Sequence, residues 1–152
     1  MATVGNIPRV ARNVLPDGLF HVTARGVARD PIFHDGIDYA EFERQLYRVR
    51  DEYEWTLHAY CLLPNHYHLI VDAKRGHLST GMHKLNGRYA QRFNRRYDRA
   101  GHVFQNRFDS YVIDSEEHFL RALAYVRANP LEAGLCENVD DWPWSGGPAD
   151  SD

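Results

Sequence analysis

The sequence predicts an α+β fold in which an antiparallel sheet is covered by helices on one face. Segments rich in β-prone residues alternate with segments of helical hydrophobic period, and two of the β-prone segments are joined by a tight Pro-Asn turn. The 152-residue chain, 43% hydrophobic and 26% charged, has the size and composition of one globular domain. We therefore expect a single domain over residues 1–152, with a core over about 8–145 and a flexible tail over 146–152.

The first half of the chain predicts three strands and one helix. Residues 19–24 are β-prone and end at an Arg-Gly turn signal, which predicts a strand. Residues 38–53 repeat apolar side chains at helical period, which predicts a helix. Residues 55–63 and 66–72 are aromatic and aliphatic and are separated only by the Pro-Asn pair, so they are expected to form a hairpin.

The second half predicts two helices and one strand. Residues 79–96 carry an apolar stripe beside a basic stripe, which is typical of a surface helix, and residues 108–113 predict a strand. Asp114 is the expected N-cap of a last helix, which should end near residue 128 because the residue before Pro130 disfavours helical geometry. The order β-α-β-β-α-β followed by one more helix is that of the ferredoxin-like split β-α-β sandwich.

Charge is distributed unevenly along the chain. The net charge of −3 argues by itself against a nucleic-acid partner. However, residues 74–107 hold nine of the 18 lysines and arginines and a single acid, whereas residues 132–152 hold six acids and no cation. A basic stripe on the helix over 79–96 has the spacing to follow a phosphate backbone; the alternative is a solvated helix face, which usually mixes both signs.

The composition also indicates a cellular compartment. Cys61 and Cys136 do not make a disulfide framework or a paired-cysteine metal motif, so a reduced, cytoplasmic setting is expected. Every apolar run is far shorter than the stretch of about 20 residues that spans a bilayer, so no membrane association is expected. The N-terminus has no apolar stretch of the kind found in secretory signals.

Two groups of residues could carry chemistry. Residues i and i+2 of a strand point to the same face, so His66 and His68 could share one metal ion; the alternative is two strand histidines on a half-exposed surface. Tyr125 and Asn129 are neighbours on the last helix. A packed tyrosine is the ordinary interpretation, because a phenol is a weak nucleophile unless a base or a metal assists it. The segment over 101–108 indicates only a polar loop before a strand.

Five motifs in order make the sequence similar to a known family. They are F-H-V-T-A-R-G at 20–26, A-Y-C-L-L-P-N-H-Y-H-L-I-V at 59–71, L-N-G-R-Y at 85–89, G-H-V-F-Q at 101–105 and Y-V-R-A-N-P-L-E-A-G-L at 125–135. With them the chain resembles the REP-associated tyrosine transposases, a branch of the bacterial single-tyrosine HUH transposases with an IS200-like domain. The resemblance covers roughly residues 8–145.

This resemblance implies a reaction on single-stranded or hairpin DNA from palindromic repeats. Tyr125 would attack a phosphodiester, leaving a 5′-phosphotyrosine and a free 3′-hydroxyl. His66, His68 and Asn129 would hold a divalent ion, Mg²⁺ or Mn²⁺; of the two, Mn²⁺ suits imidazole better, because Mg²⁺ prefers oxygen ligands. Both a monomer and a homodimer are compatible with the family. The residues expected to contact DNA are Arg9, Arg12, Arg25, Lys84, Arg88, Arg92, Arg95, Arg96 and Arg107.

Two other functions fit the same residues. A non-catalytic module that binds single-stranded nucleic acid could have the ferredoxin-like order, and it would need neither a metal nor Tyr125. A metal-dependent hydrolase of a small phosphate ester could use His66 and His68 but would release its product to water, so it would form no adduct between protein and DNA.

Overall fold

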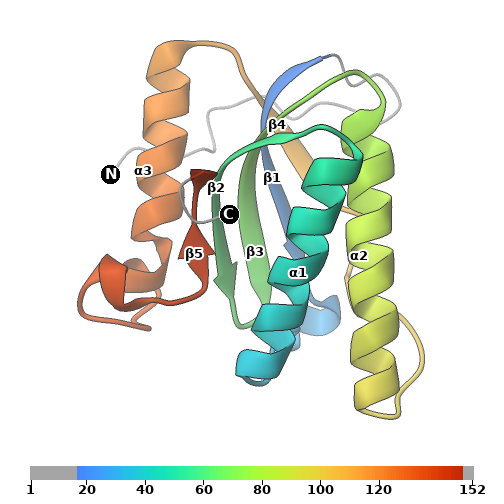
Figure 1. Ribbon diagram of the computed structural model, residues 1–152. Helices are drawn as coiled ribbons and strands as arrows, with labels where there is room; N and C mark the ends of the chain where they lie inside the picture. The colour runs from blue at the N-terminus through green and yellow to red at the C-terminus, as the bar shows by residue number, and fades with distance from the viewer. Residues whose placement is uncertain (1–16, 149–152) are drawn as a thin grey trace.

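The computed structural model describes residues 17–148, which form one antiparallel sheet and three α-helices (Figure 1). The sheet has the strand order β4-β1-β3-β2-β5. Its strands are β1 (Gly18–Arg25), β2 (Thr56–Leu63), β3 (His66–Ala73), β4 (Asp109–Ile113) and β5 (Ser145–Gly146). The helices are α1 (Gly36–Glu52), α2 (His77–Arg96) and α3 (Glu116–Glu132). The predicted α+β fold is confirmed. Within the described residues, none of the helices is long and apolar enough to cross a membrane.

The main hydrophobic core lies between one face of the sheet and the pair α1 and α2 (Figure 1). Alternate residues of β1 and β3 point into it, among them Phe20 and Tyr67, which are fully buried. From α1, Phe42 packs its ring 4.6 Å from that of Tyr67, and from α2, Tyr89 lies 5.2 Å from Phe42. These two helices cover one face of the sheet, as the sequence predicted.

The third helix covers part of the opposite face, a position that the prediction of helices on one face did not include (Figure 1). Ala122 and Val126 of α3 are buried against Cys61, Leu63 and Ile70 of the neighbouring strands. The strands therefore present apolar side chains on both faces, and α3 packs where the second apolar patch lies. The part of the second face that α3 does not cover carries polar residues, among them Thr23, His66 and His68.

The N-terminus of α3 differs from the sequence prediction. Its N-cap is Ser115, whose side chain accepts a hydrogen bond from the backbone N–H of His118 at 3.1 Å. Asp114, the expected cap, instead lies 2.6 Å from Nδ1 of His118. Both residue types are good N-caps, so their order along the chain, not their chemistry, decides which one occupies the position.

The C-terminus of α3 also lies beyond the predicted end. The helix continues through the buried Pro130 to Glu132. The carbonyl of Asn129 accepts from the N–H of Ala133, and that of Pro130 accepts from the N–H of Leu135, both at 2.9 Å. The bonds made after the proline therefore hold the last turn. Gly134 follows with φ +74°, the left-handed conformation that commonly ends a helix.

The end of the described chain is paired with the sheet rather than loose. Gly146 lies in β5, opposite Tyr60 of β2, so the predicted tail does not begin at this residue. Just before it, the indole N–H of Trp142 donates to the carbonyl of Leu62 at 2.9 Å, and the carbonyl of Trp144 accepts from the Leu62 N–H at 2.8 Å. Residues 149–152 lie outside the described part of the chain.

Candidate functional site

A polar pocket opens on the second face of the sheet, beside α3. Sheet register explains which residues meet there: Arg25 lies opposite His66, while Thr23 lies between His68 on one neighbouring strand and Asp109 on the other. Residues opposite one another in an antiparallel pair point to the same face. The pocket is lined by Thr23, Ala24, Arg25, His66, His68, Gln105, Asn106, Phe108, Asp109 and Tyr125.

The two histidines of β3 share this face, as their spacing predicted. Tyr67, between them, points the opposite way into the main core, where its hydroxyl donates to Oδ1 of Asn86 at 2.5 Å. The ring centroids of His66 and His68 are 5.1 Å apart. The strand alternation thus places one residue in the core and its two neighbours in the pocket.

The geometry of His66 and His68 fits a shared metal ion. With metal–nitrogen bonds of about 2 Å, two imidazoles on one ion have centroids about 5 Å apart. Nε2 of His68 is buried and has no hydrogen-bond partner among residues 17–148. Residues 17–148 contain no group of three or more histidine, cysteine, aspartate or glutamate side chains that could hold a metal ion. The two histidines would therefore form an open site, with positions left for other donors.

Tyr125 reaches the pocket from α3. Its neighbour Val126 and the preceding Ala122 are buried against the sheet, which turns the phenol ring toward the histidines. The Tyr125 ring lies 5.5 Å from that of His68, edge to face. Asn129, one helical turn further on, is half-buried and does not line the pocket. The structure thus brings Tyr125 next to the two histidines. The role of Asn129 as a metal ligand stays a prediction.

A third histidine lies behind the first two. His21 of β1 is completely buried, and its Nε2 is 2.9 Å from Nδ1 of His68. Burial lowers the pKa of His21 to about 4 and that of His68 well below its ordinary value. Burial, together with the charge of Arg25, also lowers the pKa of His66. All three imidazoles are therefore neutral near pH 7, the form in which histidine binds a metal.

The loop before β4 forms one wall of the pocket, a position that the sequence alone did not predict. The N–H of Gln105 donates to the carbonyl of Arg25 at 2.9 Å, and Asn86 of α2 donates to the carbonyl of Arg107 at 2.8 Å. These bonds hold Gln105 and Asn106 at the pocket. His21 was missed in the same way. In both cases the signal was present in a motif, F-H-V-T-A-R-G or G-H-V-F-Q, but its partners lie far away in the sequence.

Comparison with known proteins assigns the family. A family model described as "Transposase IS200 like" matches residues 16–129. The chain belongs to the IS200-like transposase family. A Haemophilus influenzae protein assigned to the REP-associated tyrosine transposases is 28% identical over 121 residues, 71% of this chain and 68% of that protein. The resemblance found in the sequence is confirmed.

Two solved structures show that the fold of this IS200-like transposase is shared. A REP-associated tyrosine transposase bound to a REP hairpin has a TM-score of 0.73 at 20% identity, covering 91% of this chain and 82% of that one. A crystal structure of a transposase assigned to Deinococcus radiodurans R1 has a TM-score of 0.53 at 16% identity, covering 78% of this chain and 95% of that one.

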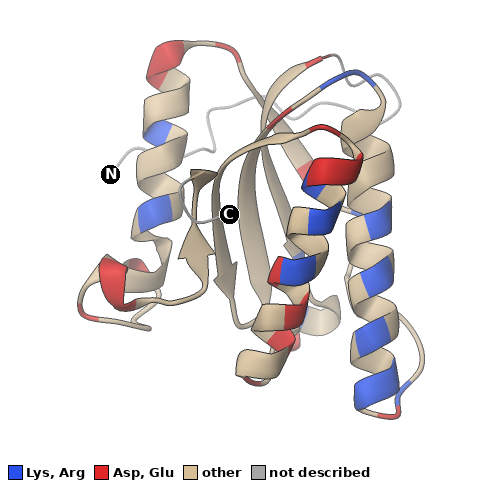
Figure 2. Ribbon diagram, viewed as in Figure 1, with Lys and Arg blue, Asp and Glu red and all other residues tan. Residues whose placement is uncertain are grey.

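The cations predicted to contact DNA do not form one surface in this IS200-like transposase. Arg25 lines the pocket, and Arg107 lies on the adjoining loop. The basic residues of α2 follow the outer side of a helix that packs against the other face of the sheet (Figure 2). We call them the α2 stripe; they are Lys84, Arg88, Arg92, Arg95 and Arg96. Arg9 and Arg12 lie outside the described residues. The pocket and the α2 stripe are thus two separate basic regions.

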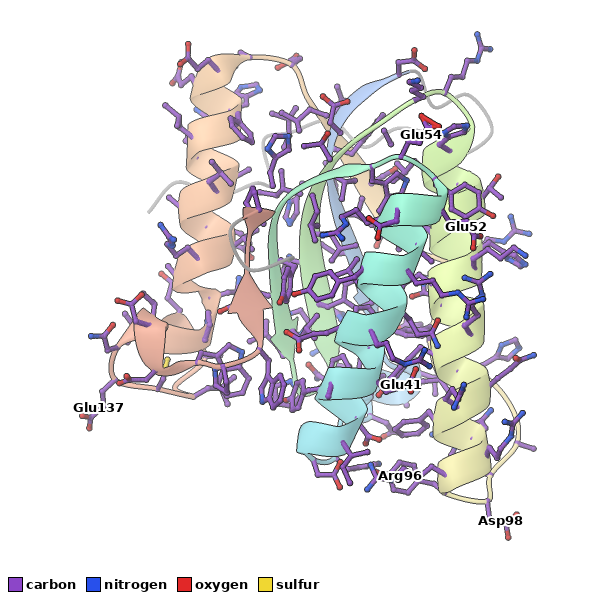
Figure 3. The ribbon with its side chains drawn as sticks, viewed as in Figure 1. Glu41, Glu52, Glu54, Arg96, Asp98 and Glu137 are labelled. Atoms are coloured by element: carbon purple, nitrogen blue, oxygen red, sulfur yellow. The ribbon has the colours of Figure 1, made fainter. Side chains whose placement is uncertain are left out.

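The α2 stripe is also less free of acids than the sequence indicated, because α1 supplies them (Figure 3). Arg96 makes contacts of 2.6 Å with both Asp35 and Asp38, and its hydrogen bond lowers the pKa of Asp35 to about 2. Arg88 lies 3.4 Å from Glu52. In the described part of the chain, the cations of the stripe without an ion pair are Lys84, Arg92 and Arg95.

Proposed function

We propose that this IS200-like transposase is a metal-dependent endonuclease and strand-transferase of single-stranded DNA, with Tyr125 as its nucleophile. The observation that carries the proposal is the pocket in which the Tyr125 ring from α3 lies 5.5 Å from His68, itself beside His66. A nucleophile beside neutral metal-binding groups is the arrangement that phosphodiester transesterification needs.

The reaction exchanges one phosphoester for another. The Tyr125 oxygen forms a bond to phosphorus, the bond from phosphorus to the 3′-oxygen breaks, and the phenolic proton passes to solvent while the 3′-oxygen takes up a proton. The products are a 5′-phosphotyrosine and a free 3′-hydroxyl, and the reverse reaction rejoins strands. Mn²⁺ or Mg²⁺ bound to His66 and His68 would polarise the phosphoryl oxygen and neutralise developing negative charge.

Other pocket residues have roles in holding DNA. Arg25 is exposed at the pocket and, in the residues from 17 to 148, makes no ion pair, so its guanidinium is available for a phosphate. The side-chain amides of Gln105 and Asn106 can each donate and accept hydrogen bonds with a base or a sugar. Asn129 would complete the metal site only if its side chain turned toward the histidines.

The substrate that we propose is hairpin DNA with a short single-stranded flank. It is supported by the family and by the structural similarity to a transposase that is bound to a REP hairpin. The single-stranded flank would enter the pocket. Lys84, Arg92 and Arg95 lie on the opposite side of the sheet, so a duplex stem would have to pass around the molecule to contact both regions.

The test is covalent capture of the DNA. The protein is incubated with Mn²⁺ or Mg²⁺ and a labelled hairpin oligonucleotide from its own genome's repeats, and the products are separated on a denaturing gel. We expect a metal-dependent adduct that disappears in Tyr125→Phe. Tyr111→Phe is the matched control, because Tyr111 lies near His21 on the same face but outside the pocket, and this variant should keep the adduct.

The denaturing gel, together with a native gel-shift assay that measures non-covalent DNA binding, separates the alternatives. Cleavage without an adduct, unchanged in Tyr125→Phe, would indicate a hydrolase that uses water. DNA binding that needs neither metal nor Tyr125, with no cleavage of any repeat sequence, would indicate a non-catalytic binding module. Either result would contradict the proposed nucleophile.

A further inference from the structure

His21 lies behind the two pocket histidines and takes no direct part in the proposed reaction. His21 is completely buried and does not line the pocket. Its ring stacks on that of His68 with centroids 5.1 Å apart, and its Nε2 lies 2.9 Å from Nδ1 of His68. The remaining surroundings of the ring include Tyr111 on β4 and Tyr125 on α3, with centroids 6.1 and 6.0 Å away.

The register of the strands explains why the two imidazoles meet. Thr23 lies opposite His68, and His21 lies two residues earlier on the same face of β1. His21 is therefore a diagonal neighbour of His68, within reach of a large side chain. The residue directly opposite His21 on β3 is Ile70, which offers no polar atom. His68 is consequently the hydrogen-bond partner that this geometry gives to His21.

The hydrogen bond between the two neutral rings contains one proton, which leaves two arrangements. If Nε2 of His21 donates, Nδ1 of His68 is the acceptor and His68 carries its own proton on Nε2, where no metal can then bind. If Nδ1 of His68 donates, Nε2 of His21 is the acceptor and Nε2 of His68 keeps its lone pair. Among the described residues, Nε2 of His68 and Nδ1 of His21 are both buried without a hydrogen-bond partner, so each arrangement leaves one of these two atoms as an unpaired N–H. Only the second arrangement places that N–H on His21 and leaves Nε2 of His68 free for a cation.

The tautomer of His66 provides a comparison for that of His68. Nδ1 of His66 lies 2.8 Å from Oδ1 of Asn65, and an amide oxygen only accepts hydrogen bonds. The orientation of this amide is set by its other end, because Nδ2 of Asn65 donates to the carbonyl of Arg29 at 3.2 Å. His66 must therefore carry its proton on Nδ1, which leaves its Nε2 bare.

We infer that His21 is a positioning residue, which accepts the Nδ1 proton of His68 and so holds the Nε2 lone pair of His68 available to a divalent cation. His21 and Asn65 then serve the same purpose for the two histidines of β3. Such outer hydrogen bonds orient metal-binding histidines and select their tautomer. The inference rests on the proposed function in one respect, namely that His66 and His68 bind the cation.

The first test reads the tautomer directly, in metal-free protein labelled with ¹⁵N at histidine. Long-range ¹H–¹⁵N spectra at pH 7.5 distinguish a proton on Nδ1 from one on Nε2, and the His68 signals are assigned by their loss in His68→Gln. We expect the proton of His68 on Nδ1. A proton on Nε2 of His68 in the unaltered protein would overturn the inference without any variant having to fold.

The second test compares variants of His21 for both tautomer and Mn²⁺ affinity, measured by calorimetry. His21→Phe keeps a ring but removes the acceptor, so the proton of His68 should move toward Nε2 and Mn²⁺ affinity should fall about 10- to 100-fold. His21→Gln places an amide oxygen where it can accept, and it should restore both quantities. Ile70→Val, the packing control, should change neither.

The outcomes separate this inference from the proposed function. An unchanged His68 tautomer in His21→Phe would overturn the role of His21, whatever the protein does to DNA. If instead His21→Phe shifts the tautomer and His21→Gln restores it, the role is supported even where no tyrosine–DNA adduct forms. The absence of an adduct would then count against the proposed reaction alone.

Discussion

The two faces of the sheet are built from the same strands but are used differently. On the face under α1 and α2, residues such as Phe20 and Tyr67 are fully buried in an aromatic core. On the other face, their direct neighbours His21, His66 and His68 form a row of imidazoles beside the pocket. Because successive residues of a strand point to opposite faces, stability and chemistry alternate along a single strand. Substitutions at adjacent positions should therefore have unlike effects.

The largest expected difference is between Phe20 and His66. Phe20→Ala removes a fully buried ring from the main core and should lower the free energy of unfolding by about 3–5 kcal/mol. His66→Ala changes a half-buried residue at the end of β3 and should cost less than about 1 kcal/mol while weakening Mn²⁺ binding. Urea unfolding and calorimetry measure the two effects. Equal losses of stability would mean that the two faces are not separable.

A somewhat smaller loss of stability is expected at acid pH. It comes from His21, on the face of the sheet that carries the histidines. The pKa of His21 is about 4 in the folded protein against 6.5 ordinarily, so between these values the unfolded chain binds a proton that the folded one does not. Stability contributed by neutral His21 is therefore complete above pH 6.5 and is lost as the pH falls toward 4, by about 3 kcal/mol. Urea unfolding of metal-free protein at both pH values measures it.

The variant His21→Phe provides the control for this pH dependence. It lacks the titrating group, so its stability should fall by less over the same interval. If both proteins lose the same stability between pH 7 and pH 4, protonation of His21 is not the cause.

The smallest effect is expected on the face of the sheet that α1 and α2 cover, where the exposed cations of α2 could contribute to DNA binding. Replacing Lys84, Arg92 and Arg95 together by Gln should leave folding unchanged, because these side chains have exposed positions on α2. If they contact single-stranded DNA phosphates, the slope of log affinity against log salt should decrease in magnitude by about 2. Arg44→Gln/Arg48→Gln on α1 is the control. An unchanged slope in the triple variant would restrict DNA contacts to the pocket side.

Local sequence patterns predicted the elements well, because helical and strand periods depend on neighbouring residues. The shared face of His66 and His68 followed from the two-residue period, and the choice of Tyr125 as the candidate nucleophile came from the resemblance to the family. The side of the sheet on which α3 packs could not be predicted in this way. It depends on a second apolar patch, contributed by Cys61, Leu63 and Ile70 from two strands.

Other features depend on contacts between distant segments. His21 meets His68 across 47 positions of sequence, and Arg96 meets Asp35 across 61. A charge pattern read along α2 alone cannot reveal the acids that α1 places beside it. The end of the last helix shows a different limit. Pro130 disfavours helical geometry for the residue before it, yet the helix continues to Glu132, and backbone hydrogen bonds to the carbonyls of Asn129 and Pro130 hold its last turn.

The pairing of the chain end with β2 has a consequence for solubility. An unpaired outer strand exposes backbone donors and acceptors that can recruit a strand of another molecule. Here β5 and the two tryptophans before it occupy these groups at Tyr60, Cys61 and Leu62. A chain shortened before Trp142 would keep its pocket residues but would present this strand uncovered. We expect such a chain to self-associate through the exposed backbone of β2. The segment from Trp142 to Gly146 would then be needed to keep the protein from aggregating.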